Sequence, residues 1–108
     1  MRKSALSPDY RTREVISNRL RGLRPALEVE GVRHAALFGS VARGEDVAES
    51  DVDIVLDLDP AKCVGLFQFA GIQQLLEENL GRHVDLATRA SLRPGRHDEI
   101  LADLFEVF

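Results

Sequence analysis

The chain has 108 residues and a mass of 12.0 kDa, which is enough for one domain and leaves no room for a second. It has no apolar run near the ~20 residues that cross a bilayer, its start lacks the apolar segment of a signal peptide, and its net charge of −4 argues against a general nucleic-acid binder. We therefore expect a cytoplasmic protein without membrane contact or direct nucleic-acid binding.

Charge is divided unevenly along the chain. Residues 1–44 carry nine Arg and Lys against four Asp and Glu, whereas residues 45–108 carry five against fourteen. The two parts therefore attract each other, and most of the acidic side chains are expected on the solvated surface. The single Cys63 cannot form an internal disulfide and is interpreted as an idle thiol.

The first predicted helix follows a segment without a pattern. Residues 1–11 are expected to be flexible, so that one domain spans residues 12–108. Thr12 is the predicted N-cap. The apolar residues that follow at helical spacing are Ile16, Leu20, Leu23 and Leu27. Pro25 removes an amide donor and clashes with the preceding turn, so we predict a kink or break near residues 22–24.

A buried strand leading into a glycine turn is predicted next. The apolar run from His34 to Phe38 stops at Gly39 and Ser40. Glycine lets the backbone come close to a ligand, and backbone N–H groups with a serine hydroxyl form an anion cradle at the start of a short helical turn. The turn is therefore a candidate phosphate site.

A pair of aspartates opens the second predicted strand. Asp51 and Asp53 lead into the apolar run from Ile54 to Leu56. Because side chains alternate along a strand, both carboxylates point to one face, with Cα atoms about 6.7 Å apart. Either feature alone is common, Gly-Ser in turns and Asp-x-Asp as a solvated strand start. Together they suit a nucleoside triphosphate held with Mg²⁺.

A helix is predicted from Leu66 to Asn79, ended by Gly81. Its expected core side consists of Phe69, Ile72, Leu76 and Leu80. Phe67 is also interpreted as core, and an aromatic shelf for a nucleotide is the alternative for Phe67 and Phe69.

The third predicted strand, Arg82 to Thr88, carries an aspartate in its middle. A strand, helix, strand sequence of this length makes the second and third strands neighbours. Asp85 would be costly if buried alone. It lies either on a solvent-facing edge or beside Asp51 and Asp53.

The end of the chain has a helical pattern and an apolar terminus. Pro94-Gly95 precede Ile100, Leu101 and Leu104, and the chain ends on Phe108. These last apolar residues either close the core or form a surface for a partner.

The spacing of these motifs resembles a known family. Gly39-Ser40 is followed after ten residues by Asp51-x-Asp53, and the stretches Gly39 to Glu45 and Ser50 to Asp53 resemble the signature of the polymerase β-like nucleotidyltransferase superfamily. The match is nearest to the minimal nucleotidyltransferases, or MNT domains, which are the antitoxins of HEPN/MNT toxin–antitoxin pairs. The resemblance covers residue 12 to the end. It implies an α/β (α+β) fold with a small mixed β-sheet and helices packed on one face.

The resemblance also implies roles for residues of this chain. Gly39 and Ser40 would hold the triphosphate of ATP. Asp51 and Asp53 would bind two Mg²⁺ ions. Asp85 would complete the metal and catalytic site and orient or deprotonate the attacking hydroxyl.

Arg43 matches the arginine of the family motif. Its role stays open between contact with phosphate and an ion pair that ties the loop to Glu45 or Asp51.

The resemblance implies an antitoxin that transfers AMP from ATP to a tyrosine of a HEPN toxin, with which it forms a hetero-oligomer. A chain of this length has no domain of its own to bind an acceptor. Two alternatives remain, an antitoxin that blocks its toxin by binding alone and a subunit of a small-molecule nucleotidyltransferase. The intact carboxylates weigh against the first alternative, and the missing substrate domain weighs against the second.

Overall fold

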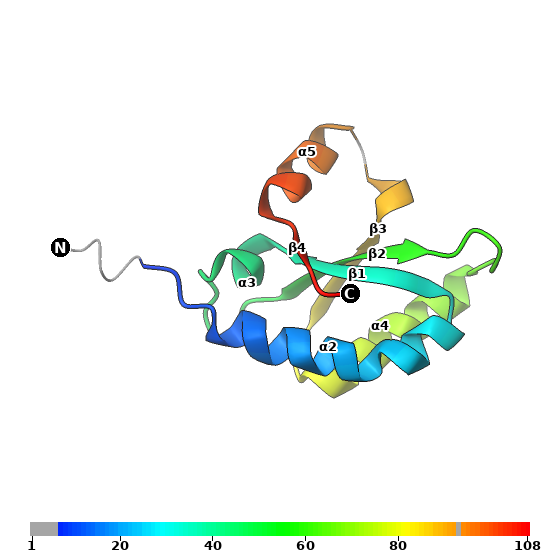
Figure 1. The fold of residues 1–108 in the computed structure, drawn as a ribbon, viewed down its shortest axis with the longest axis horizontal. Helices are drawn as coiled ribbons and strands as arrows, with labels where there is room; N and C mark the ends of the chain where they lie inside the picture. Colours follow the sequence, from blue (N-terminus) through cyan, green and yellow to red (C-terminus); the bar gives the residue numbers. More distant parts are fainter. Residues whose placement is uncertain (1–6, 93) are drawn as a thin grey trace.

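The computed structural model describes residues 7–92 and 94–108. Figure 1 shows the arrangement of its helices and strands. In chain order they are α2 (Arg11–Val29), β1 (Val32–Phe38), α3 (Gly39–Arg43), β2 (Val52–Leu58), α4 (Leu66–Leu80), β3 (Val84–Thr88), the 3-10 turn η1 (Arg89–Ser91), α5 (Pro94–Asp103) and β4 (Phe105–Glu106). Within these described ranges, none of the helices combines the length and apolarity that a membrane span requires.

The strands form one mixed sheet in the order β3-β2-β1-β4. β2 and β3 are parallel and joined by α4, whereas β1 pairs antiparallel with both β2 and β4. The prediction that the second and third strands are neighbours is therefore confirmed. A parallel pair needs a crossover connection of a dozen or more residues, and α4 provides it.

The main core lies between the sheet and the helices α2 and α4, which cover the same face (Figure 1). Alternate residues of β2 point into it, and their side chains are fully buried: Val52, Ile54 and Leu56. α4 contributes Ile72, Leu76 and Leu80, as its spacing predicted.

A smaller apolar cluster lies on the opposite face of the sheet, where α5 packs. It joins Ala36 and Phe38 of β1 and Val55 of β2 to Ile100 of α5. α5 covers only part of this face, so the polar residues of β2 and β3 that point the same way stay accessible from outside.

α2 runs without interruption through Pro25, so of the predicted kink or break near residues 22–24 the break was wrong. Leu20 and Leu27, on either side of the proline, are both fully buried in the core. Burying a leucine side chain contributes about 1.5–3 kcal/mol, and a proline inside a helix costs about 3 kcal/mol. A continuous helix keeps both leucines buried, which offsets the cost of the proline.

The start of α2 also differs from the prediction. Tyr10, and not Thr12, occupies the N-cap position, and the helix begins at Arg11. The carboxylate of Asp9 accepts the backbone N–H of Arg11 at 3.1 Å. Asp9 thus supplies the acceptor that was expected from Thr12.

Phe67 is the clearest departure from the expected core. Its side chain is 91% exposed, as is most of Leu66 beside it, whereas Phe69 is half-buried. The interpretation of Phe67 as a core residue was wrong, because Phe67 lies in the first turn of α4 with its side chain in solvent. Residues five and nine positions later, Ile72 and Leu76, carry the buried face.

The apolar end of the chain closes the core. Phe105 and Glu106 form β4, which pairs with Leu37 and Ala36 of β1. Val107 is buried and Phe108 is packed against the main core. The sequence left open whether these residues close the core or form a surface for a partner, and the structure shows that they close the core.

Candidate active site

The predicted phosphate turn lies where β1 ends and α3 begins. Gly39 has φ +74°, a conformation that residues with a side chain rarely adopt. A Cβ at Gly39 would clash with the Asp53 carboxylate and lie only 3.0 Å from its Cγ atom. The glycine is therefore what allows the carboxylate of Asp53 to lie directly against the turn. Ser40, the next residue, is half-buried.

Asp53 and Asp85 are direct neighbours in the sheet. In the parallel register of β2 and β3, Asp53 is paired with Asp85, and on its other side Asp53 is paired with Phe38. Paired residues point to the same face, which here is the face of α5. Asp53 is half-buried and Asp85 is exposed. Both explanations for Asp85 hold together, since β3 is an edge strand on which Asp85 is exposed to solvent and Asp85 also lies beside Asp53.

Asp51 lies one residue before β2, with an exposed side chain. Its Oδ1 atom is 3.3 Å from Nδ1 of His83. His83 Nε2 is in turn 3.7 Å from Oε2 of Glu77, and that carboxylate accepts the backbone N–H of Val84 at 3.0 Å. His83 thus lies between the first aspartate of the pair and a further acid, Glu77.

The sequence reasoning missed this role of His83, although a signal was present. Once β2 and β3 are paired in parallel with Asp53 opposite Asp85, residue 51 falls opposite residue 83. The register alone therefore brings His83 to Asp51.

Arg43 forms ion pairs with two acids. Its Nε atom is 2.8 Å from Glu45 Oε1, and its Nη1 atom is 2.8 Å from Asp103 Oδ2 at the end of α5. The hydrogen bonds to Glu45 and then to Asp103 raise the pKa of Arg43 above its usual value. The guanidinium therefore ties α3 to the following loop, as one of the two open alternatives expected, and also to α5.

A second arginine holds α3 from the other side. The guanidinium of Arg13 lies 4.0 Å from the ring centroid of Tyr10 and 4.1 Å from that of Phe105, and its Nη1 atom donates to the carbonyl of Ala42 at 3.0 Å. Arg13 thus joins the start of α2 and the strand β4 to the middle of α3. The sequence offered no sign of this contact, because its members are far apart in the chain.

The segment before α2 also packs on α3. Asp9 donates its backbone N–H to the carbonyl of Gly44 at 2.8 Å. Gly44, with φ +73°, has no space for a Cβ, because the ring of Tyr10 lies against it. Asp9 and Tyr10, which the sequence assigned to a flexible segment outside the domain, therefore contact Gly44 at the C-terminal end of α3. Residues 1–6 lie outside the described residues.

Comparison with known families identifies this arrangement. A family model described as a nucleotidyltransferase domain matches residues 16–105. The chain belongs to the nucleotidyltransferase domain family. The protein adenylyltransferase MntA of Thermococcus cleftensis is 38% identical to it over 77 residues, which make up 71% of this chain and 76% of that protein. The resemblance drawn from the sequence motifs is thereby confirmed.

Two solved structures share the fold of this nucleotidyltransferase domain. A toxin–antitoxin structure with AMP-PNP aligns with a TM-score of 0.70 at 21% identity, over 85% of this chain and 72% of that one. A structure of a tri-AMPylated Shewanella oneidensis HEPN toxin in complex with MNT antitoxin aligns with a TM-score of 0.64 at 18% identity, over 88% and 71%. At these identities the likeness establishes the fold, a mixed sheet with its helices.

The carboxylates of this nucleotidyltransferase domain lie next to one another on the sheet and do not surround a metal site. In the part of the chain that the structure describes, no three or more His, Cys, Asp or Glu side chains are grouped so as to hold a metal ion. Mg²⁺ bound with a nucleotide usually takes one or two carboxylates and completes its shell with phosphate oxygens and water. Asp53 and Asp85, side by side, provide that number. The donor set therefore fits Mg²⁺ that arrives with a nucleotide rather than a resident ion.

Proposed function

We propose that this chain transfers AMP from ATP to a tyrosine hydroxyl of a cognate HEPN toxin and thereby neutralises the toxin. The observation that carries the proposal is the contact of Gly39 with Asp53, with Asp85 next to it in the sheet. The protein adenylyltransferase activity in the name of the MntA relative supports it, and so does the AMPylated HEPN toxin in the structural match. Because ATP is the substrate, we place the reaction in the cytoplasm.

Binding of ATP is assigned to the turn and to the first two aspartates. We propose that Gly39 and Ser40 bind the triphosphate through their backbone N–H groups and the Ser40 hydroxyl. Asp51 and Asp53 would hold Mg²⁺ on the phosphate oxygens, and Asp85, next to Asp53 in the sheet, would complete the metal site. A pair of such ions would lower the pKa of the attacking hydroxyl and neutralise the charge of the leaving group. The AMP-PNP in a structural match supports ATP as the substrate.

Transfer is assigned to an in-line displacement at the α-phosphorus. The tyrosine oxygen forms a bond to phosphorus, the bond from phosphorus to the bridging oxygen breaks, and pyrophosphate leaves. The proton of the tyrosine passes to the carboxylate of Asp85. Asp85 suits this role because its side chain is exposed, whereas Asp53 is half-buried against the turn.

Arg43 is proposed to serve the nucleotide site indirectly. Glu45 and Asp103 already neutralise its guanidinium and fix its direction. We propose that Arg43 keeps α3 in place beneath the phosphates and that contact with the nucleotide, if it forms, is secondary.

The proposed activity is tested by the mass of the partner. The chain is co-expressed with a cognate HEPN protein, and the intact mass of that protein is measured. We expect added units of AMP that are absent when the chain carries Asp51→Asn and Asp53→Asn. A partner that stays unmodified and is nevertheless inhibited would overturn the proposal and favour an antitoxin that acts by binding alone.

Dependence on Mg²⁺ is tested separately, by calorimetry of ATP binding with and without Mg²⁺. We expect tight binding only with the metal, and we expect the double variant to remain folded while losing the metal-dependent part. Equal affinity of the variant for ATP and Mg²⁺ would remove Asp51 and Asp53 from the site.

A further inference from the structure

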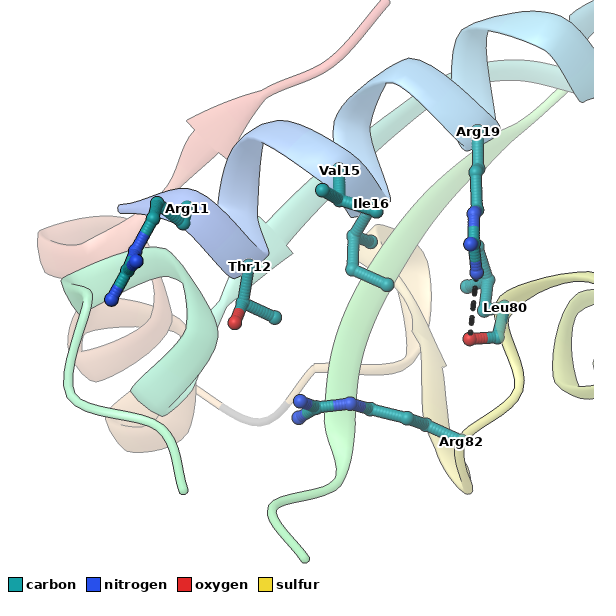
Figure 2. A pocket seen from close by; sticks show the side chains of 7 residues that line it. All are labelled: Arg11, Thr12, Val15, Ile16, Arg19, Leu80 and Arg82. Carbon is teal, nitrogen blue, oxygen red and sulfur yellow. Dashed lines mark hydrogen bonds between the residues drawn. The ribbon is translucent and has the colours of Figure 1, made fainter. Parts of the chain in front are cut away.

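A cleft lined by arginines lies beside the N-terminal half of α2 (Figure 2). Its volume is about 240 Å³. Its lining residues are Arg11, Thr12, Val15, Ile16, Arg19, Leu80 and Arg82. Three of these seven residues are arginines and none is acidic, although the chain as a whole carries a net charge of −4.

The three guanidinium groups differ in how far other groups neutralise them. In the described part of the chain, Arg11 pairs with Asp9 at 2.6 Å and Arg82 pairs with Asp46 at 3.6 Å. Arg19 instead donates to the backbone carbonyl of Leu80 at 3.4 Å, as Figure 2 shows. A carbonyl accepts a hydrogen bond without cancelling the charge. Arg19 therefore contributes the least compensated positive charge in the cleft.

Apolar side chains line the cleft between these arginines. Val15 is 49% exposed, and Ile16 and Leu80 lie deeper as part of the core. A free phosphate ion would leave this apolar surface uncovered. A carboxylate side chain next to an aliphatic one would satisfy the guanidinium groups and cover the apolar surface together. The lining therefore favours an acidic segment of a protein over a small inorganic anion.

The cleft is connected to the loop that carries Asp51. Arg82 Nη1 donates to the carbonyl of Ser50 at 3.3 Å, and Ser50 directly precedes Asp51. The cleft lies on the side of α2, whereas Asp53 and Asp85 face the side of α5, but both lie at the end of the sheet where β2 and β3 begin. A protein bound in the cleft is thus close to the end of the sheet where Asp53 and Asp85 lie.

We propose that this cleft is a docking site for an acidic segment of the protein that accepts AMP. Carboxylates of that segment bind Arg19 and Arg11, and a neighbouring aliphatic side chain packs on Val15. This inference rests on the proposed function, since it assigns a docking point to the same acceptor. The excess of acidic residues elsewhere on the chain repels such a segment and so favours one orientation of the partner.

The test compares two charge reversals of equal size, using a cognate HEPN protein as the probe. Arg19→Glu changes the cleft, and Arg33→Glu changes an exposed arginine that lines a different hollow at the start of β1. For Arg19→Glu we expect a Kd for the probe raised at least about tenfold, as for an arginine central to an interface. We expect Arg33→Glu to stay within about twofold, and both variants to bind ATP with Mg²⁺ as the unaltered chain does.

Kinetics provide a second readout. If the cleft only docks the acceptor, Arg19→Glu raises the KM for the probe and leaves kcat at saturation unchanged. Equal Kd values for the two variants would overturn the docking site, even if AMP transfer by the unaltered chain is normal. The docking site would also be overturned if Arg19→Glu lost binding of pyrophosphate but kept its affinity for the probe. The cleft would then be a site for phosphate groups.

The two proposals fail in different ways. If the unaltered chain binds the probe without modifying it, the proposed transfer is wrong, and the Kd comparison still decides the docking site. If the unaltered chain does not bind the probe at all, both are overturned.

Discussion

Asp53 and Asp85 face each other across the parallel strands β2 and β3, although α4 separates them in the chain. Neighbouring strands lie about 4.7–4.9 Å apart, so the two carboxylates can reach a common ligand. Like charges at that distance repel each other unless a cation lies between or near them. The sheet thus holds two acids in an arrangement that favours a divalent cation, and Gly39 provides the space for one of them.

Asp85→Asn should separate binding from chemistry. We expect the variant to bind ATP with Mg²⁺ nearly normally, because Asp51 and Asp53 are kept, but to transfer AMP at least about 10²-fold more slowly. That loss corresponds to about 2.7 kcal/mol of transition-state stabilisation. Single-turnover rates at saturating ATP measure it. A rate within a few-fold of the unaltered chain would show that Asp85 is only an exposed strand residue.

Gly39→Ala should damage the site because an added Cβ clashes with the Asp53 carboxylate and the residue must keep φ +74°. Strain of this kind costs about 1–3 kcal/mol. We expect a lower free energy of unfolding and weaker ATP binding, measured by urea unfolding and calorimetry.

Gly71→Ala is the matched control for this substitution. Gly71 lies inside α4 and a Cβ there meets nothing within 4 Å. Alanine in an open helical position stabilises by about 0.5–1 kcal/mol relative to glycine. Equal losses in the two variants would contradict a specific role for the glycine beside Asp53.

Arg13→Ala should loosen α3. The substitution removes two contacts of the guanidinium with aromatic rings and the hydrogen bond to Ala42. At about 0.5–1 kcal/mol for each ring and about 1 kcal/mol for the hydrogen bond, we expect a loss of about 2–3 kcal/mol in urea unfolding. Arg24→Ala, which removes one more distant ring contact at 5.1 Å and an exposed ion pair with Glu28, should cost less than half as much. If the two variants lose similar free energies of unfolding, the contacts of Arg13 contribute no more to stability than those of Arg24.

Asp9 should have a pKa well below the usual value of an aspartate. Hydrogen bonds from the side chain and then the backbone of Arg11 lower the pKa of Asp9 from 3.8 to about 2. Because the folded pKa is depressed, the stabilising contribution of the pair is complete above pH 3.8 and is lost as the pH falls through about 2. NMR titration should find this value, and Arg11→Ala should return it towards 3.8. An unchanged pKa in the variant would rule out this pair as the cause.

The sequence was sufficient wherever a local pattern determined the outcome. The helix over Leu66–Leu80 followed from the spacing of its buried residues and from the glycine that ends it. The adjacency of β2 and β3 followed from topology, because a crossover of that length joins neighbouring parallel strands, whereas the place of Asp85 beside Asp53 was expected from the family resemblance. The first feature depends on residues within one helix, and the second depends on three consecutive elements, β2, α4 and β3.

Features that depend on distant partners could not be predicted. β4 has two residues, too few for a periodic pattern, and exists because β1 offers an unpaired edge. Asp103 became a partner of Arg43 only through the packing of α5 over the sheet. The continuity of α2 through Pro25 likewise depends on how well the sheet buries Leu20 and Leu27.

The clamp of Arg13 between Tyr10 and Phe105 places a late part of the chain on an early one. During synthesis, α3 leaves the ribosome well before Asp103 and Phe105. Asp103 pairs with Arg43 of α3, and Phe105 packs on Arg13, which donates to Ala42 of α3. While those residues are still in the exit tunnel, the turn that contains Gly39 has only its N-terminal support. We therefore expect the nascent chain to be unable to retain ATP, so that modification of a partner starts only after this last segment has emerged.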